Sequence, residues 1–228
     1  MPFESTKTRQ VRGADFEQRY LQGRVIDIGC GPDLVVSHAE PFDIEDGNAE
    51  QIGSLRPQNS YDAVHSSHCL EHMSDAPAAL AQWWSLVKPG GFLIVVVPEE
   101  DLYEQGFWPS LFNTDHKSTF RLRRPTTWSP KSQEVEELFR ALPGAKLISA
   151  ELYDANYDYS LKRLAGSSWG RFLFRVNGRL NRDLKRLGLL SDGAERALDR
   201  LMFTLGAPID QLSRKALAQI QIIAQKEA

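Results

Sequence analysis

The chain contains little cysteine and no long apolar stretch. Its 228 residues include two cysteines, Cys30 and Cys69, which form neither a Cys-x-x-Cys pair nor another metal-ligand spacing. No segment reaches the run of about 18 apolar residues that a membrane-spanning helix needs. The first residues, MPFESTKTRQ, hold no apolar run of a secretion signal. These absences argue against a disulfide framework and a spanning helix, and they predict a soluble, cytoplasmic protein with reduced thiols.

A strong net charge is also absent. The 27 basic and 30 acidic side chains give a formal net charge of −3, which predicts no overall attraction to nucleic acid or to an anionic membrane. One segment departs from this balance, because between Ser160 and Gly188 the acidic residue Asp183 stands among eight basic ones. These are Lys162, Arg163, Arg171, Arg175, Arg179, Arg182, Lys185 and Arg186.

Short β-branched runs alternate with helical patterns along most of the chain. The continuous apolar run at 92–98 is typical of a strand that is buried on both faces of a parallel sheet. This alternation predicts an α/β fold with a doubly wound, mostly parallel sheet, in which ligands bind beyond the carboxyl ends of the strands. Strands are expected at 24–29, 41–44, 61–67, 92–98, 146–154 and 218–226, and helices at 75–87 and 129–142, the second with Ser129 as N-cap and Pro130 in its first turn.

Two regions lie outside this alternation. Residues 1–22 are polar, and a short amphipathic helix is expected there around Phe16 and Tyr20. Residues 23–228 are expected to form one domain that carries a helical basic insertion at about 160–212. Within the insertion an apolar stripe recurs at three- and four-residue steps, which predicts a helix that packs on the domain. The stripe consists of Leu173, Val176, Leu180, Leu184 and Leu187.

The stretch VIDIGCGPD at 25–33 lacks the third glycine of a dinucleotide-binding loop. Leu34 occupies the place of that glycine, so the loop makes a poor cradle for a pyrophosphate. Asp27 and Asp33 put two carboxylates around the turn, and these favour a ligand with an ammonium or sulfonium group over one with two phosphates. A Gly-x-Gly after a strand is a weak signal by itself, because an ordinary tight turn has the same pattern.

Three stretches, in this order, resemble the class I S-adenosylmethionine-dependent methyltransferases. They are VIDIGCG (25–31), PFDIEDGNAEQI (41–52) and the segment 61–100, which contains LEHM and the turn KPGG. Within the class the chain is most similar to the subgroup with an LEH segment after the fourth strand, and the resemblance covers about residues 23–155. It implies a Rossmann-like sheet of the seven-stranded type, a helical insertion before an antiparallel last strand at 218–226, and S-adenosylmethionine as cofactor.

The resemblance also assigns residues to the cofactor. Gly29 and Gly31 would let the backbone approach its methionine part, and Asp27 would face its amino group. Asp43 resembles the acidic residue that accepts hydrogen bonds from the ribose hydroxyls, with an exposed turn carboxylate as the alternative. The adenine would lie beside Asn48 and Ala49. The full set that the resemblance implies is Asp27, Gly29, Cys30, Gly31, Asp43, Asn48, Ala49 and Ser66, the last near the methyl donor.

Two features depart from the family's pattern. Asp33 stands where the family usually has a further glycine, which leaves open where the methionine carboxylate would bind. Ten residues separate Gly31 from Phe42, so the first crossover helix is expected to be short, and an expected strand and helix are compressed in this region.

Candidate catalytic residues occur in the segments SSHCLEHM and FNTDHKSTF. His116 lies in the long loop 99–130, which in this family crosses the substrate side of the cofactor. Since an imidazole accepts protons near neutral pH, His116 is the candidate general base, and Asp115 is the residue that would orient it. The alternative is that His116 pins the loop through a hydrogen bond to the backbone.

The first of these segments contributes two more histidines. His68 is expected to line the acceptor pocket, whereas His72 is expected to pack beneath the sheet as a hydrogen-bonded core residue. No metal site is predicted, because no single element carries histidines and carboxylates at a ligand spacing.

The sequence therefore predicts S-adenosylmethionine-dependent methylation of a small molecule, on oxygen rather than nitrogen. The resemblance points to a sugar or cell-envelope glycan intermediate, anionic or lipid-linked, as acceptor. The basic helix expected at 169–187 predicts weak contact with an anionic membrane surface, or merely a solvated insertion. No nucleic acid is expected, because aromatic residues are not interleaved with the charges. The rival interpretations are a nicotinamide-dependent oxidoreductase and a non-catalytic module with the same fold.

Overall fold

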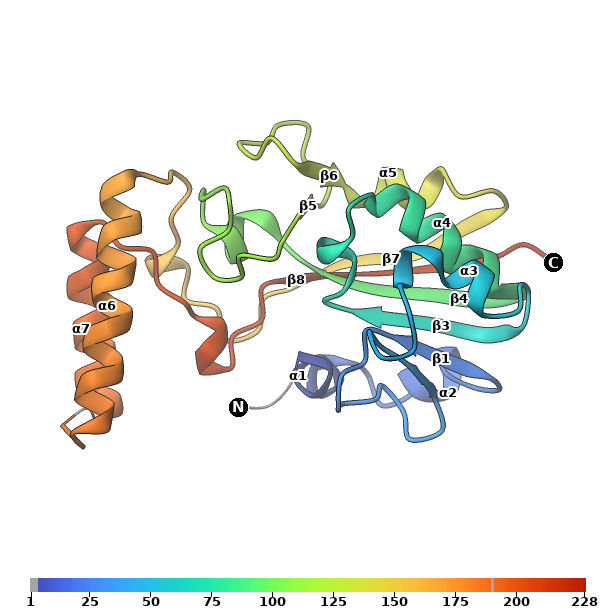
Figure 1. Cartoon of the computed structure of the whole chain (residues 1–228), viewed down its shortest axis with the longest axis horizontal. Helices are drawn as coiled ribbons and strands as arrows, with labels where there is room; N and C mark the ends of the chain where they lie inside the picture. Colours follow the sequence, from blue (N-terminus) through green and yellow to red (C-terminus); the bar gives the residue numbers. More distant parts are fainter. Residues whose placement is uncertain (1–3, 190) are drawn as a thin grey trace.

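The computed structural model describes residues 4–189 and 191–228, which are built around a six-stranded sheet in the order β2-β1-β3-β4-β8-β7 (Figure 1). The first four strands pair in parallel, whereas β8 is antiparallel to both β4 and β7. The predicted α/β class, with a mostly parallel sheet and an antiparallel terminal strand, is confirmed. The strands are β1 (Val25–Ile28), β2 (Glu40–Phe42), β3 (Tyr61–Ser67), β4 (Val87–Pro98), β7 (Ala145–Tyr153) and β8 (Gln219–Lys226).

Helices cover both faces of the sheet, as Figure 1 shows. Ile26 of β1 packs with Trp83 of α4 on one face, and Val25 packs with Leu21 on the other, because successive side chains of a strand point to opposite sides. Burying each large side chain contributes about 1.5–3 kcal/mol. One face carries α3 (Ile52–Leu55), α4 (Ala76–Leu86) and α5 (Val135–Arg140), and the other carries α1 (Glu4–Val11) and α2 (Phe16–Tyr20).

The helix α4 matches its sequence signals. Asp75 is the N-cap, its Oδ1 accepts a hydrogen bond from Ala78 N, and Pro77 lies in the first turn. The helix ends at Leu86 and β4 begins at Val87, and within its first part Gly90 has a left-handed φ of +81°. The chain thus passes directly from α4 into a strand whose last six residues are buried.

The expected helix 129–142 is wrong in its first half. Residues Ser132–Glu134 form β6, which pairs in parallel with β5 (Thr119–Arg121). The helix α5 begins at Val135, and its N-cap is Glu134, whose carboxylate accepts from Glu137 N. A tertiary partner strand has overridden the local Ser-Pro start signal.

The region between β1 and β3 is compressed, as its length predicts. Residues 29–39 form turns, and the short crossover helix expected there is not formed by these described residues. Between β2 and β3 the described residues form the 3₁₀ turn η1 (Ala49–Gln51) and the short α3, with no further strand. The sheet therefore has six strands where the seven-stranded type has one more.

The insertion before β8 is a helical hairpin. Figure 1 shows α6 (Ser168–Arg186) and α7 (Asp192–Leu205) side by side, beyond the carboxyl ends of the parallel strands. Leu173 and Val176 pack against Met202 of α7, whereas Leu180 and Leu187 are exposed. The apolar stripe thus packs on its neighbouring helix over about half its length and does not pack on the sheet. The boundaries at 22 and at about 160–212 stay predictions.

No helix among the described residues is both long and apolar enough to cross a membrane. The remaining short turns are η2 (Leu70–His72), η3 (Glu100–Glu104), η4 (Tyr159–Leu161) and η5 (Leu212–Arg214).

Candidate cofactor and acceptor site

The turn after β1 depends on glycine at position 29. Gly29 has φ +71°, its N–H donates to Phe42 O at 2.7 Å, and a Cβ there would lie 2.6 Å from Cys69 Sγ. No other residue fits such a position without moving the turn. Burial raises the pKa of the Cys69 thiol to about 12, so this neighbour stays uncharged.

Asp43 joins the end of β2 to the same turn. Its Oδ2 accepts a hydrogen bond from Gly31 N at 2.6 Å, and its Oδ1 accepts from Ile44 N at 2.7 Å. Each carboxylate oxygen keeps a lone pair for a further donor. The backbone at Gly31 and the carboxylate of Asp43 are thereby held together at the carboxyl end of the sheet.

A cavity of about 620 Å³ opens beside this turn. Its volume falls within the range of about 300–1,000 Å³ that is usual for small-molecule sites. Residues from both the expected cofactor region and the expected acceptor region form its wall. They are Gly29, Phe42, Asp43, Ile44, Gly47, Asn48, Ala49, His68, Cys69, His72, Met73, Asp115 and Lys117.

The cavity brings together six of the expected site residues and leaves five off its wall. Gly29, Asp43, Asn48, Ala49, His68 and Asp115 line it, whereas Asp27, Cys30, Gly31, Ser66 and His116 do not. Asn48 uses its Oδ1 to cap η1 at Glu50 N, which leaves its amide NH₂ group for a ligand. Ser66 is buried and donates its hydroxyl to Ile28 O, so its side chain is directed into the sheet.

Asp27 is directed away from the cavity as well. Its side chain lies on the face covered by α1 and α2, where Oδ2 accepts from Val35 N at 2.7 Å and Oδ1 meets His65 Nδ1 at 2.6 Å. The expected contact with a cofactor amino group does not fit this orientation. Instead Asp27, through Val35 N, anchors the loop that leads from β1 to β2.

The ring of His65 is neutral in this arrangement. Arg12 Nη2 lies 3.1 Å from His65 Nε2, and since a guanidinium can only donate, Nε2 must be the acceptor and Nδ1 must carry the hydrogen that Asp27 accepts. Burial lowers the pKa of His65, against the opposing effect of Asp27. A second proton on this ring would face the Arg12 cation inside the protein.

We expect the protein to lose stability on acidification because of His65. Its folded-state pKa is below the unfolded value of about 6.5, so the unfolded state takes up a proton first as the pH falls below about 6.5. The stability that the neutral His65 contributes is fully present above that pH. Urea unfolding between about pH 8 and 5 measures it, and wild type should show a steeper slope than His65→Gln, by up to about 1.4 kcal/mol per pH unit. Equal slopes would contradict a neutral, buried His65.

Asp33 serves the N-terminal helix and not a ligand. Its Oδ2 accepts from Thr6 N at 2.7 Å and from Thr6 Oγ1 at 2.8 Å, and Arg9 Nη2 lies 3.6 Å from Oδ1. A carboxylate at a helix N-terminus satisfies a donor that the helix leaves unpaired. The inference that Asp33 complements a cationic ligand is therefore wrong. No sequence signal indicates that α1 lies beside this loop.

The predicted pairing of Asp115 with His116 is also wrong. His116 is buried, and its Nδ1 lies 2.6 Å from Glu104 Oε1, whereas Asp115 Oδ2 lies 2.9 Å from His72 Nδ1. Adjacent residues point in different directions, so each acid orients a histidine from another segment. His72 lies on the cavity wall and not beneath the sheet as expected.

The turn that carries Glu104 is clamped by Arg124. The guanidinium contacts the carboxylates of Glu99, Glu100 and Asp101 at 2.8, 3.1 and 2.5 Å. Such multiple charge-assisted bonds are stronger than neutral ones and fix geometry. Arg124 thereby anchors η3, which presents Glu104 to His116.

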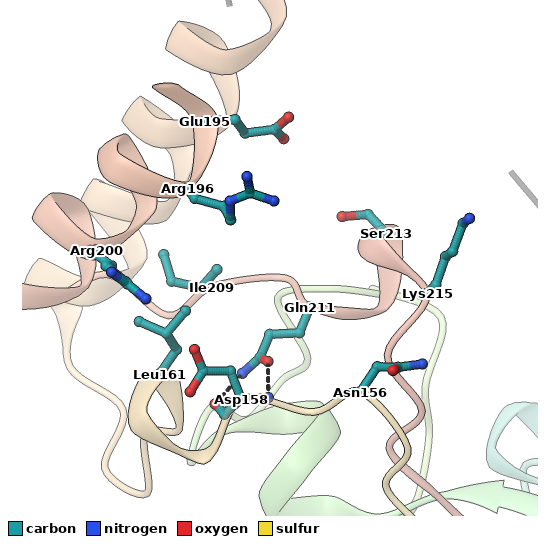
Figure 2. Close-up of a pocket in the computed structure, with 10 residues that line it drawn as sticks. All are labelled: Asn156, Asp158, Leu161, Glu195, Arg196, Arg200, Ile209, Gln211, Ser213 and Lys215. Atoms are coloured by element: carbon teal, nitrogen blue, oxygen red, sulfur yellow. Dashed lines mark hydrogen bonds between the residues drawn. The ribbon is translucent and has the colours of Figure 1, made fainter. Parts of the chain in front are cut away.

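A second cavity, of about 440 Å³, lies where α7 meets the segments 156–161 and 209–215 (Figure 2). Arg196 and Arg200 line it from α7, Lys215 lies on the opposite side, and a pair of hydrogen bonds joins Asp158 to Gln211 at its floor. It shares no lining residue with the cavity beside Gly29 among those described. It belongs to the base of the helical hairpin.

Comparison with known families identifies the domain. Residues 7–141 match the family model described as a methyltransferase domain. None of the curated proteins matches this chain significantly.

A solved structure with a TM-score above 0.5 agrees with this at the level of the fold. A SAM-dependent methyltransferase from Archaeoglobus fulgidus shares 17% identity over 98% of this chain and 94% of its own, with a TM-score of 0.51. The YcgJ protein from Bacillus subtilis shares 15% over 92% and 94%, with a TM-score of 0.49. A phosphoethanolamine N-methyltransferase 2 from Haemonchus contortus, solved with phosphomonomethylethanolamine and S-adenosylhomocysteine, shares 15% over 92% of this chain and 51% of its own, with a TM-score of 0.45.

Proposed function

Because this chain belongs to the methyltransferase-domain family and is an S-adenosylmethionine-dependent methyltransferase, we propose that it methylates a hydroxyl group of a small, anionic acceptor. The observation that carries the proposal is the cavity of about 620 Å³, which joins the Gly29–Asp43 region to a wall of histidines and a lysine. The family assignment also argues against the two rival interpretations, a nicotinamide-dependent oxidoreductase and a non-catalytic module.

The residues at one end of the cavity fit the cofactor. Gly29 lets the turn pass close to Cys69 on the cavity wall, Asp43 offers carboxylate lone pairs for the ribose hydroxyls, and Asn48 offers an amide for the adenine. When bound, the cofactor supplies a methyl group activated on a sulfonium. The protein's part is to hold the acceptor in line and to exclude water.

The other end of the cavity favours an oxygen acceptor. A hydroxyl must lose its proton when it is methylated, and the imidazoles of His68 and His72 line the wall beside Asp115. Asp115 contacts Nδ1 of His72 and so fixes the orientation of the ring, which leaves Nε2 for another partner. An amine acceptor would make less use of oriented imidazoles.

Two features support an anionic acceptor. Lys117 places an amino group on the cavity wall. Beyond the strand ends, α6 exposes Arg175, Arg179, Arg182 and Arg186 to solvent, and Trp169 and Phe172 near its start are 57% and 55% exposed. Exposed cations beside exposed aromatics suit an acceptor that a lipid holds at an anionic surface.

Turnover on paired acceptors tests this proposal. We expect S-adenosylhomocysteine release with a sugar phosphate and little with the matching amino compound, and a higher rate when a lipid anchors the sugar phosphate in a vesicle. Lys117→Ala should raise KM for the sugar phosphate about two- to fivefold with kcat nearly unchanged, because exposed ion pairs contribute up to about 1 kcal/mol.

The matched control is Lys146→Ala, an exposed lysine on β7 outside the cavity. Equal KM values for wild type and Lys117→Ala would remove Lys117 from acceptor binding. Faster turnover on the amine would contradict oxygen methylation.

A further inference from the structure

Three potential metal ligands converge at the acceptor end of the cavity. Glu71, His72 and His116 each offer a ligand atom, and these atoms all lie within 4.8 Å of one another. Donor atoms on one ion lie about 3–3.5 Å apart, because each bond is about 2.0–2.2 Å long. Small side-chain rotations would therefore bring all three onto a single ion.

Glu71 is a buried carboxylate that faces histidine rings. Its residue is 0% exposed, and neither oxygen takes part in a hydrogen bond of normal geometry. The nearest nitrogens are His68 Nδ1 at 3.3 Å and His116 Nε2 at 3.9 Å from Oε1. A buried carboxylate is costly unless it is well paired or coordinates a metal ion, and a metal ion would satisfy Glu71 better than these long contacts with histidine rings do.

Both histidines of the group are held in the way that metal ligands usually are. A metal-bound histidine almost always gives its other ring N–H to a carboxylate, a carbonyl or water. Here Glu104 contacts Nδ1 of His116 at 2.6 Å, and Asp115 contacts Nδ1 of His72 at 2.9 Å. The acids fix both rings and leave the Nε2 atoms for coordination.

The backbone keeps the two segments in register. Glu71 and His72 lie on η2, and His116 lies in the loop before β5. The carbonyl of Glu71 accepts hydrogen bonds from Lys117 N at 2.8 Å and Ser118 N at 3.2 Å. The group is thus built into the fold at the point where the loop crosses η2.

We propose that Glu71, His72 and His116 bind a divalent transition-metal ion with a coordination position open toward the cavity. Two imidazoles and one carboxylate suit Zn²⁺, Mn²⁺ or Fe²⁺ better than Mg²⁺, which prefers oxygen ligands. Because His72 lies on the cavity wall, the open position faces the acceptor end.

The role of the ion rests on the proposed function. A divalent ion holds a hydroxyl oxygen in place and lowers the pKa of the bound group. At this position it would orient the acceptor oxygen, while Lys117 contacts the anionic part of the same molecule. The site also explains why the buried acid Glu104 is committed to orienting His116.

Metal binding to chelator-treated, cofactor-free protein is the test. Calorimetry with Zn²⁺, Mn²⁺ and Mg²⁺, each alone, should show one transition ion per chain with a Kd of about 1 μM or below, and weaker Mg²⁺ binding. Glu71→Gln and His116→Gln should lower the affinity by about 100-fold, whereas His38→Gln, an exposed histidine elsewhere, should leave it unchanged. No binding to wild type, or equal binding by wild type and both variants, would overturn the proposal.

A second readout does not depend on the variants folding. Co²⁺ bound by wild type through imidazole nitrogens gives visible absorption bands, and their absence at saturating Co²⁺ would overturn the site. Binding of S-adenosylhomocysteine is measured on the same samples. If the protein binds S-adenosylhomocysteine but no metal, only the proposed metal site is refuted. If it binds metal but methylates no hydroxyl, only the proposed function is refuted.

Discussion

Replacing Gly29 by alanine is expected to lower cofactor affinity by about 100-fold and the free energy of unfolding by about 2–4 kcal/mol. The new Cβ would lie 2.6 Å from Cys69 Sγ and 2.7 Å from Cys69 Cβ, in a residue whose φ is +71°. The loop must therefore move or displace Cys69, and both residues line the cavity. Calorimetry with S-adenosylhomocysteine and urea unfolding measure the two effects.

Gly90→Ala provides the matched control. Gly90 also has a left-handed φ, of +81°, but a Cβ there meets no atom within 4 Å. The control should lose about 1 kcal/mol of stability from backbone strain alone, with unchanged cofactor affinity. Wild-type affinity in Gly29→Ala would place the cofactor elsewhere and remove the glycine turn from the site.

The second large effect is expected at Asp43. Asp43→Ala should weaken cofactor binding by about 1–3 kcal/mol, or roughly fivefold to more than a hundredfold. The substitution removes the acceptor for Gly31 N and the carboxylate that faces the cavity. Asp43→Asn, which keeps the shape but loses the charge, should give a smaller loss.

Asp46→Ala separates ligand binding from turn stability. Asp46 Oδ2 accepts from Asp43 N, yet Asp46 does not line the cavity among the residues described there. We expect this variant to bind S-adenosylhomocysteine within about threefold of wild type, because it loses a hydrogen bond of the turn and not one to the ligand. If Asp43→Ala behaved like Asp46→Ala, Asp43 would be an ordinary turn carboxylate.

The expectations that held depend on local signals. The apolar run of β4, the helix α4 and the glycine turn after β1 each involve residues close in sequence. Hydrophobic periodicity and capping act over one or two turns of chain. They are therefore readable without knowing what packs against them.

Three expectations that failed concern partners that are distant in sequence. Asp33 accepts a hydrogen bond from Thr6, Asp27 contacts His65, and residues 132–134 pair with β5. In each case the residue type is evident from the sequence, but its partner comes from another element. A carboxylate looks the same in a sequence whether it binds a ligand or caps a helix.

The amino-acid sequence by itself determined the α/β sheet, the antiparallel last strand and the loop at Gly29. The tertiary structure alone decided which acid orients which histidine. Glu71 and His116 lie 45 positions apart in the chain, and they meet because the loop after η3 hydrogen-bonds to the backbone of η2. Spacing rules find ligands on one helix or strand, whereas this group forms only where two segments cross.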